Sequence, residues 1–172
     1  MIILKTSYLA RGGLLTALGL IFIYLSTLVP TNKLFLLIIA SSLIPIGIIS
    51  TNLKVGIINY IGTCLLSLFI IGFKGSVLLY IIFFGLYGIV KLYIEKLRKI
   101  PLELILKFAF FNFSLLVSFF IYKNFLPNID LNKFFIPIPI LILAAEVVFF
   151  LYDYALTLFI CEIEKKFFQK KY

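Results

Sequence analysis

The sequence predicts an all-α integral membrane protein: a bundle of six transmembrane helices with both termini on the cytoplasmic side and no soluble domain. Of the 172 residues, 63% are hydrophobic and 13% are charged, and the mean hydropathy is +1.20. Soluble domains carry about 25% charged residues, so this chain has too little polar surface to cover a water-soluble globule. Its apolar runs are also long and continuous, unlike the alternating strands of a membrane β-barrel.

Six apolar runs approach the roughly 20 residues that a helix needs to cross the hydrocarbon layer. They cover residues 12–30, 34–52, 55–73, 76–94, 108–126 and 137–160, and we expect residues 1–172 to form one polytopic membrane domain. Short polar segments such as "PTNK" and "TNLK" separate the runs, with longer loops expected over 95–107 and 127–136. The first of these loops is either a basic topology anchor or a short helix that lies on the membrane surface or on a cytoplasmic partner. Pro45 lies inside the second run, where a missing N–H predicts a kink.

The basic residues lie at the junctions between the runs and indicate the orientation. With both termini inside, 12 lysines and arginines are cytoplasmic and 4 are outside, in agreement with the positive-inside rule. The inner set is Lys5, Arg11, Lys54, Lys91, Lys96, Arg98, Lys99, Lys107, Lys165, Lys166, Lys170 and Lys171, and the outer set is Lys33, Lys74, Lys123 and Lys133. We therefore expect a multi-pass protein of the cell (plasma) membrane, in contact with membrane lipid.

Composition and charge exclude several functions. The net charge is +9, but no basic face with interleaved aromatics can be assembled without crossing lipid, so no nucleic-acid partner is expected. The chain has two cysteines and no histidine. A metal site needs about four N or S ligands, so no metal and no cofactor are expected, and Ser-His-Asp and Cys-His catalysis are excluded.

Two acids interrupt the last apolar run, in "AAEVVFFLYDYALT". Asp153 is expected near the bilayer centre, and Glu146 lies about 10 Å nearer the outside on the same helix face. Intramembrane acids face a protein interior or a water-filled cavity. Three interpretations stay open: hydrogen bonds that lock helix packing, a site for a polar ligand, and proton or cation coupling.

Other polar groups at membrane depth are candidates for the same network. They include Asn112, Tyr80, Tyr87 and Tyr152. Asn112 stands between phenylalanines, where a buried amide needs a partner, and an interhelical hydrogen bond is the simplest one.

The first run opens with small residues, in "ARGGLLTALG". Gly12 and Thr16, and likewise Gly13 and Ala17, are four residues apart, with Ala10 one turn before Gly13. Such a face lets another helix approach closely, and that helix belongs either to this chain or to a separate subunit.

Together these features resemble the S component of an energy-coupling factor (ECF) transporter. The resemblance rests on "ARGGLLTALGLIFIYLSTLVP" (10–30), on the six-span layout and on the polar last helix "EVVFFLYDYALT". It implies a vitamin or similar micronutrient bound in a pocket open to the outside, formed largely by later helices and covered by the loop after the first span. It also implies docking, through early helices, onto a membrane scaffold subunit that carries two cytoplasmic ATPases. This chain has no P-loop, in agreement with that division of labour.

The sequence therefore predicts a subunit that binds a small-molecule substrate and is not an enzyme. The expected substrate contacts are Asp153, Glu146, Asn112, Tyr80, Tyr87 and Tyr152, and the expected partner interface is Ala10, Gly13 and Ala17. Two acids in one pocket favour a ligand rich in hydrogen-bond donors or carrying positive charge. An enzymatic carboxylate dyad is disfavoured, because the two acids are too far apart to share a proton. The alternative is a structural or assembly protein whose intramembrane acids serve helix packing.

Overall fold

The regular elements of the protein are all helices in the residues that the structure describes. The computed structural model describes residues 6–29, 31–125 and 138–169. The elements are α1 (Thr6–Leu28), α2 (Lys33–Ser50), α3 (Leu53–Ile71), α4 (Gly75–Leu79), η1 (Tyr80–Phe84), α5 (Gly85–Glu95), α6 (Ile100–Phe125) and α7 (Ile138–Gln169). Within these described ranges, six segments are long and apolar enough to cross a membrane; α4, the π-helical turn η1 and α5 form one of them. The predicted all-α, six-helix membrane fold is confirmed.

The short polar breaks act as helix-end signals. Asn52 caps α3, because its side-chain oxygen accepts a hydrogen bond from the Val55 N–H at 3.0 Å. Gly72 ends the same helix at φ +80°, in the left-handed region that favours glycine. Its N–H donates to the Leu68 carbonyl, so the chain turns tightly into α4.

One expected loop is much shorter than predicted. α5 ends at Glu95 and α6 begins at Ile100. The prediction of a long inner loop over 95–107 is therefore wrong. Pro101 lies in the first turn of α6, where its missing N–H costs nothing and its fixed φ favours helix initiation. As a result Lys107 lies two turns inside α6 rather than in a loop. The loop expected over 127–136 lies outside the described residues.

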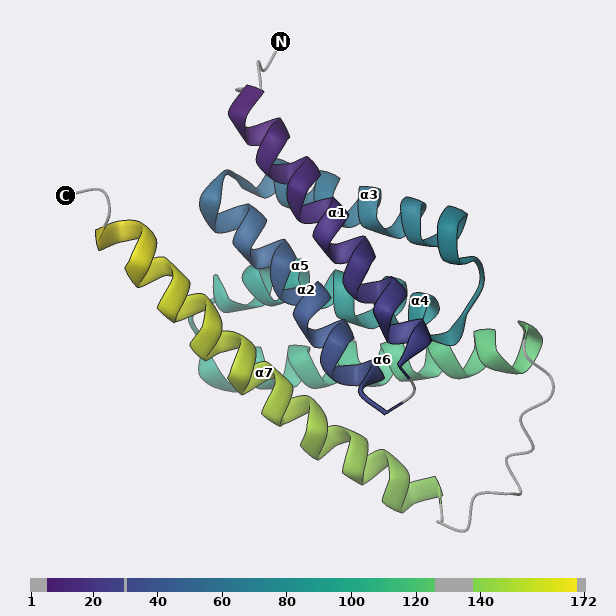
Figure 1. Ribbon diagram of the computed structural model, residues 1–172. Coiled ribbons are helices and arrows are strands. Elements are labelled where there is room, and N and C mark those ends of the chain that lie inside the picture. The colour runs from purple at the N-terminus through teal and green to yellow at the C-terminus, as the bar shows by residue number, and fades with distance from the viewer. Residues whose placement is uncertain (1–5, 30, 126–137, 170–172) are drawn as a thin grey trace.

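The helices form two layers (Figure 1). α1, α2 and α7 run side by side in one layer, and α3, the α4–α5 segment and α6 lie in the other. Glycines permit the closest crossings: a Cβ on Gly56 would lie 2.2 Å from Ile48 Cγ1, and one on Gly88 would lie 3.1 Å from Pro45 Cδ. Pro45 is inside α2, which stays helical from Lys33 to Ser50.

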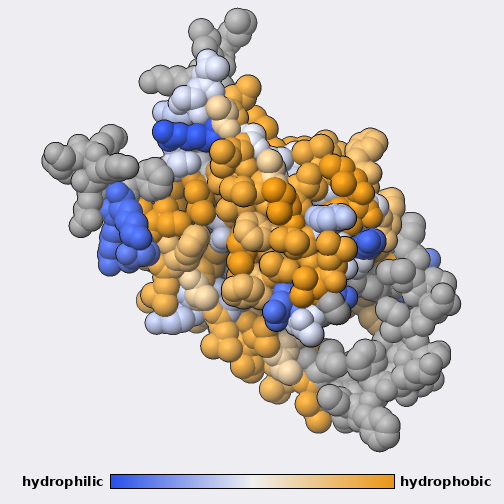
Figure 2. All heavy atoms as spheres, viewed as in Figure 1, coloured by the Kyte–Doolittle hydropathy of each residue, from blue (hydrophilic) through white to orange (hydrophobic). Residues whose placement is uncertain are grey.

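The surface matches a lipid environment. Figure 2 shows apolar side chains over most of the visible face, with hydrophilic residues mainly towards the helix ends. Large apolar side chains such as Phe69 and Phe73 are 87% and 71% exposed. Apolar side chains exposed over most of one face would make a soluble monomer aggregate, whereas in a bilayer they face hydrocarbon. The chain is a multi-pass membrane protein.

Two ends of the bundle can be distinguished. The α1–α2 end contains the turns before Lys33 and before Gly75, and the α2–α3 end contains the turns at Thr51–Asn52 and between Glu95 and Ile100. These two names are used below.

Candidate functional site

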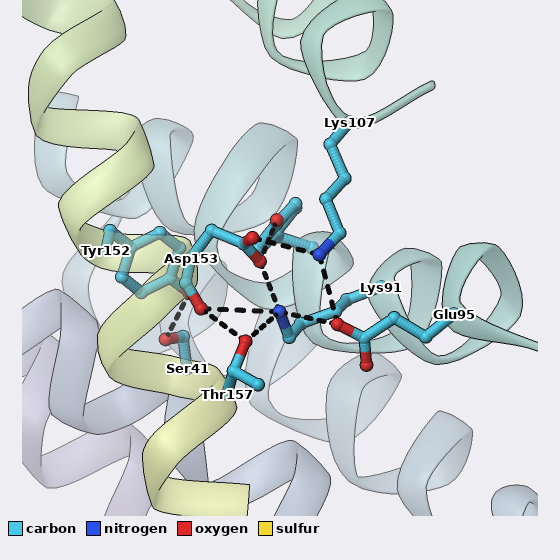
Figure 3. Close-up of polar contacts among 8 residues, drawn as sticks. Ser41, Lys91, Glu95, Lys107, Tyr152, Asp153 and Thr157 are labelled. Atoms are coloured by element: carbon cyan, nitrogen blue, oxygen red, sulfur yellow. Dashed lines mark hydrogen bonds and ion pairs between the residues drawn. The ribbon is translucent and has the colours of Figure 1, made fainter. Parts of the chain in front are cut away.

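Four charged side chains from three helices meet inside the bundle towards its α2–α3 end (Figure 3). Lys91 and Glu95 project from α5, Lys107 from α6 and Asp153 from α7. The Lys91 side chain is completely buried, and the Asp153 side chain is 15% exposed. These four residues are called the ionic cluster.

The ionic cluster is a closed set of ion pairs. Lys91 Nζ lies 2.8 Å from Glu95 Oε1 and also contacts Asp153 Oδ1. Lys107 Nζ lies 3.0 Å from Glu95 Oε1 and 2.9 Å from Asp153 Oδ2. Each ammonium therefore contacts both carboxylates, and the formal charges cancel. A paired, neutral set is far less costly to hold away from water than any one of its ions alone.

Neutral side chains complete the hydrogen bonding of the ionic cluster. Tyr87 Oη donates to Asp153 Oδ1 at 2.6 Å. Thr157 Oγ1 accepts from Lys91 Nζ at 2.7 Å and donates to the Asp153 carbonyl at 2.8 Å. An ammonium has three donors, and those of Lys91 have three side-chain acceptors in Asp153, Glu95 and Thr157. Among the described residues, no buried side-chain nitrogen or oxygen lacks a partner.

Helical spacing brings these groups to one place. Tyr87, Lys91 and Glu95 follow one another at intervals of four along α5, and Asp153 and Thr157 are four apart on α7. Residues four apart share a helix face, so each helix presents its polar groups as a single stripe. The two stripes face each other, and Lys107 reaches them from α6.

Aromatic rings pack beside the ionic cluster. The Tyr87 ring lies 5.6 Å from the Phe83 ring, 5.3 Å from that of Phe149 and 5.5 Å from that of Tyr152, measured between centroids. The Tyr152 hydroxyl makes a 2.8 Å hydrogen bond with Ser41 on α2. The aromatic core and the ionic cluster thus connect α2, α5, α6 and α7.

The structure brings together only some of the predicted contact residues. Tyr87 bonds Asp153 directly, Tyr152 packs against Tyr87, and Tyr80 is buried in the same core. Asn112 donates to the Phe108 carbonyl of its own helix at 3.1 Å, so the bond is not the interhelical one expected. Glu146 is half-buried, and within the described ranges no hydrogen bond or ion pair joins it to another residue.

Sequence reasoning missed three of the four cluster residues. The sequence pattern places Lys91 and Lys107 among the cytoplasmic topology charges and Glu95 in a loop. A signal was present for Lys91, which stands four residues before Glu95 in "VKLYIEK", the spacing of a helical ion pair. No pattern in the sequence shows that Lys107 and Asp153 meet, because they are 46 residues apart.

A second feature lies at the α1–α2 end. A cavity of about 520 Å³, partly open to the surroundings, is bounded by the turn between α1 and α2 and by the start of α4. Its polar lining comprises Thr27, Thr31, Asn32, Lys33, Lys74 and Ser76, and its apolar lining includes Phe35, Leu37 and Leu79. Ser76 and Lys91 belong to one span and are 15 residues apart, about 22 Å at helical rise. The cavity and the ionic cluster are therefore separate sites.

The two faces of α1 differ in their surroundings. Gly12 and Gly19 are buried, and a Cβ on either would lie 3.0 Å and 3.2 Å from side chains of α3. The stripe formed by Ala10, Gly13 and Ala17 is exposed, and a Cβ on Gly13 would meet nothing within 4 Å. Within the chain, α3 therefore packs against the side of α1 that carries Gly12 and Gly19. The stripe of Ala10, Gly13 and Ala17 is exposed.

Comparison of the chain with protein-family models, with curated proteins and with solved structures gives no match in any of the three. The function has to be argued from the residues and their geometry.

Proposed function

We propose that the protein is a membrane-embedded substrate-binding subunit. It captures a small polar, vitamin-like micronutrient from outside the cell and delivers it to an ATP-driven energy-coupling module of the plasma membrane. The observation that carries this proposal is the cavity at the α1–α2 end. Its volume of about 520 Å³ falls within the roughly 300–1,000 Å³ of small-molecule sites.

Orientation links the cavity to uptake. With both termini cytoplasmic, the orientation that the distribution of basic residues favours, the α1–α2 end faces outward. A solute then reaches the cavity from the external medium without crossing the bilayer. The turn after α1 borders the cavity, as the resemblance to S components implies, but the lining comes from α1, α2, α4 and their turns rather than from later helices.

The ligand is assigned to the cavity rather than to Asp153. Both oxygens of that carboxylate already accept hydrogen bonds from Tyr87, Lys91 and Lys107. A ligand at Asp153 would have to displace a lysine and break a buried ion pair, at a cost of about 3–5 kcal/mol. In this proposal the ionic cluster holds α5, α6 and α7 together while the α1–α2 end exchanges solute.

The exposed stripe on α1 supports a partner. Ala10, Gly13 and Ala17 form an exposed small-residue surface, and a Cβ on Gly13 would meet nothing within 4 Å. Small residues let helix backbones approach closely in a bilayer. We assign this stripe to a transmembrane scaffold subunit that carries two cytoplasmic ATPase subunits; the chain itself carries out no catalysis.

A second candidate function has its own observation. The ionic cluster is neutral and internally satisfied, as expected of a packing device. A structural or assembly protein, whose intramembrane acids serve only to join helices, needs nothing more.

Native mass spectrometry of gently purified protein, followed by denaturing extraction, separates the two candidates. The uptake subunit carries a stoichiometric polar small molecule. Thr31→Trp, which fills the cavity from an exposed lining position, removes that molecule, whereas Val29→Trp, at the same turn but outside the lining, retains it. Protein that carries only phospholipid in all three forms would refute the uptake proposal and favour the assembly protein.

A further inference from the structure

The cavity at the α1–α2 end contains positive charge without a counter-charge. Lys33 and Lys74 line it from two different turns. Neither forms an ion pair with a described residue, and no acid is among the described residues that line the cavity. Lys91 and Lys107 show the contrast, since each of them contacts two carboxylates.

A serine hydroxyl that opens onto the same cavity has no partner among the described residues. Ser76 is only 9% exposed and lines the cavity, yet its hydroxyl bonds to no other described residue. Ser67 and Ser114, deep within their helices, bond the carbonyl three or four residues earlier. Ser76 is the second residue of its helix, so it has no preceding helical carbonyl to bond. Its hydroxyl is available to a ligand.

The start of α2 adds further donors. Asn32 occupies the N-cap position and lines the cavity, but its side chain caps no backbone N–H. The first N–H groups of an α-helix have no acceptor within the helix, and the helix dipole makes that end partly positive. Lysines, a free hydroxyl and the start of an 18-residue helix therefore converge on one space.

We propose that this cavity binds an anionic group, a carboxylate or a phosphate, held between Lys33 and Lys74 with Ser76 as a hydrogen-bond donor. The apolar lining contacts the uncharged part of the ligand. This inference rests on the proposed function, since it names the chemical class of the solute. It replaces the expectation of a donor-rich or cationic ligand, which assumed free carboxylates; Asp153 is already neutralised by its lysines.

The anion has two possible sources, a free solute and a lipid headgroup, and isothermal titration calorimetry in nanodiscs distinguishes them. Pyrophosphate and citrate are the anionic probes, choline chloride and glycerol are the comparison probes, and ionic strength is constant. One set of nanodiscs contains only phosphatidylcholine, and the other contains phosphatidylglycerol. We expect saturable binding of an anionic probe in the neutral nanodiscs, and competition by phosphatidylglycerol if headgroups also enter.

Charge-removing variants connect the binding to the cavity. Lys33→Gln and Lys74→Gln should each raise the apparent Kd about tenfold, the equivalent of one charge-assisted hydrogen bond. Lys123→Gln is the matched control, because Lys123 is exposed on α6 and does not line the cavity. Circular dichroism melts establish that all three variants are folded.

Each outcome decides a different claim. Anion binding in neutral nanodiscs that requires Lys33 and Lys74 supports both the inference and the proposed function. If phosphatidylglycerol binds in a lysine-dependent way and free anions do not bind, the anion site is supported and the proposal of solute capture is overturned. Binding of choline or glycerol alone overturns the anion inference and leaves solute capture standing. No binding, or equal loss in Lys123→Gln, overturns the inference.

Discussion

Replacing Asp153 with asparagine tests the ionic cluster most directly. The carboxylate accepts hydrogen bonds from Lys91, Lys107 and Tyr87. An asparagine of the same shape retains one acceptor oxygen, places an N–H₂ donor against a lysine, and leaves two buried ammonium groups with one carboxylate. Breaking a buried pair by removing one partner costs about 3–5 kcal/mol. For a chain of this size that corresponds to a fall in Tm of roughly 6–20 °C.

The melting temperature is measured by circular dichroism in nanodiscs, with Glu162→Gln as control. Glu162 is an exposed acid on the same helix, and its replacement should change stability by less than about 0.5 kcal/mol. The second arm combines Asp153→Asn with Lys107→Met, which leaves Lys91 paired with Glu95 and restores neutrality.

Because charge balance is the proposed cause, the double variant should melt at a higher temperature than Asp153→Asn alone. The coupling between contacting sites should exceed about 0.5 kcal/mol. A fall in Tm for Asp153→Asn no larger than that of Glu162→Gln would refute the reasoning. Strict additivity in the double variant would also refute it.

Three further predictions concern packing and hydrogen bonds. Gly56→Ala should destabilise the protein by about 1–3 kcal/mol in the same melts, because its Cβ would lie 2.2 Å from Ile48 Cγ1; Gly13→Ala, with nothing within 4 Å, should be neutral or slightly stabilising. Tyr87→Phe should cost about 1.5–3 kcal/mol, since the lost bond is to a charged group. Tyr152→Phe loses only a bond to Ser41 and should cost about 0.5–1.5 kcal/mol, so a larger loss for Tyr152→Phe than for Tyr87→Phe would contradict the assignment.

The sequence was a good guide to the spans, because crossing a bilayer requires a long apolar run and little else is compatible with one. It was a poor guide to the start of α6, which lies at Ile100 rather than at residue 108. The basic residues of "KLRKIPLELILK" favour a loop through Lys107. A lysine inside an apolar helix is nevertheless tolerated when another helix supplies its counter-charge. That counter-charge comes from Asp153, far along the chain, and single-sequence patterns do not report such a contact.

The same reason explains the mixed result for the candidate contacts. Asp153 and Tyr87 were selected as polar groups at membrane depth, and they do bond each other. Glu146 is expected to contact the same ligand as Asp153 because two helical turns return to the same face, but sharing a face does not make two side chains share a partner. A pocket open to the outside is implied by the resemblance alone, but its lining residues at the α1–α2 end are not, since its lysines and hydroxyls come from two turns that are distant in sequence.

The place of the charges within the bundle explains how a membrane protein tolerates them. The span Gly75–Glu95 is the most enclosed of the six, with 56% of an apolar 18-residue stretch buried, against 17–39% for the corresponding stretches of the others. It carries Lys91, the most deeply buried charge of the ionic cluster. The lipid-facing helices α6 and α7 turn Lys107 and Asp153 inward to the same span. Because the central span brings its own Glu95 four residues after Lys91, α5 is neutral by itself, and the remaining charges balance only when Lys107 of α6 and Asp153 of α7 are both present in the ionic cluster. Separating α6 or α7 from the bundle therefore leaves a buried charge without its counter-charge.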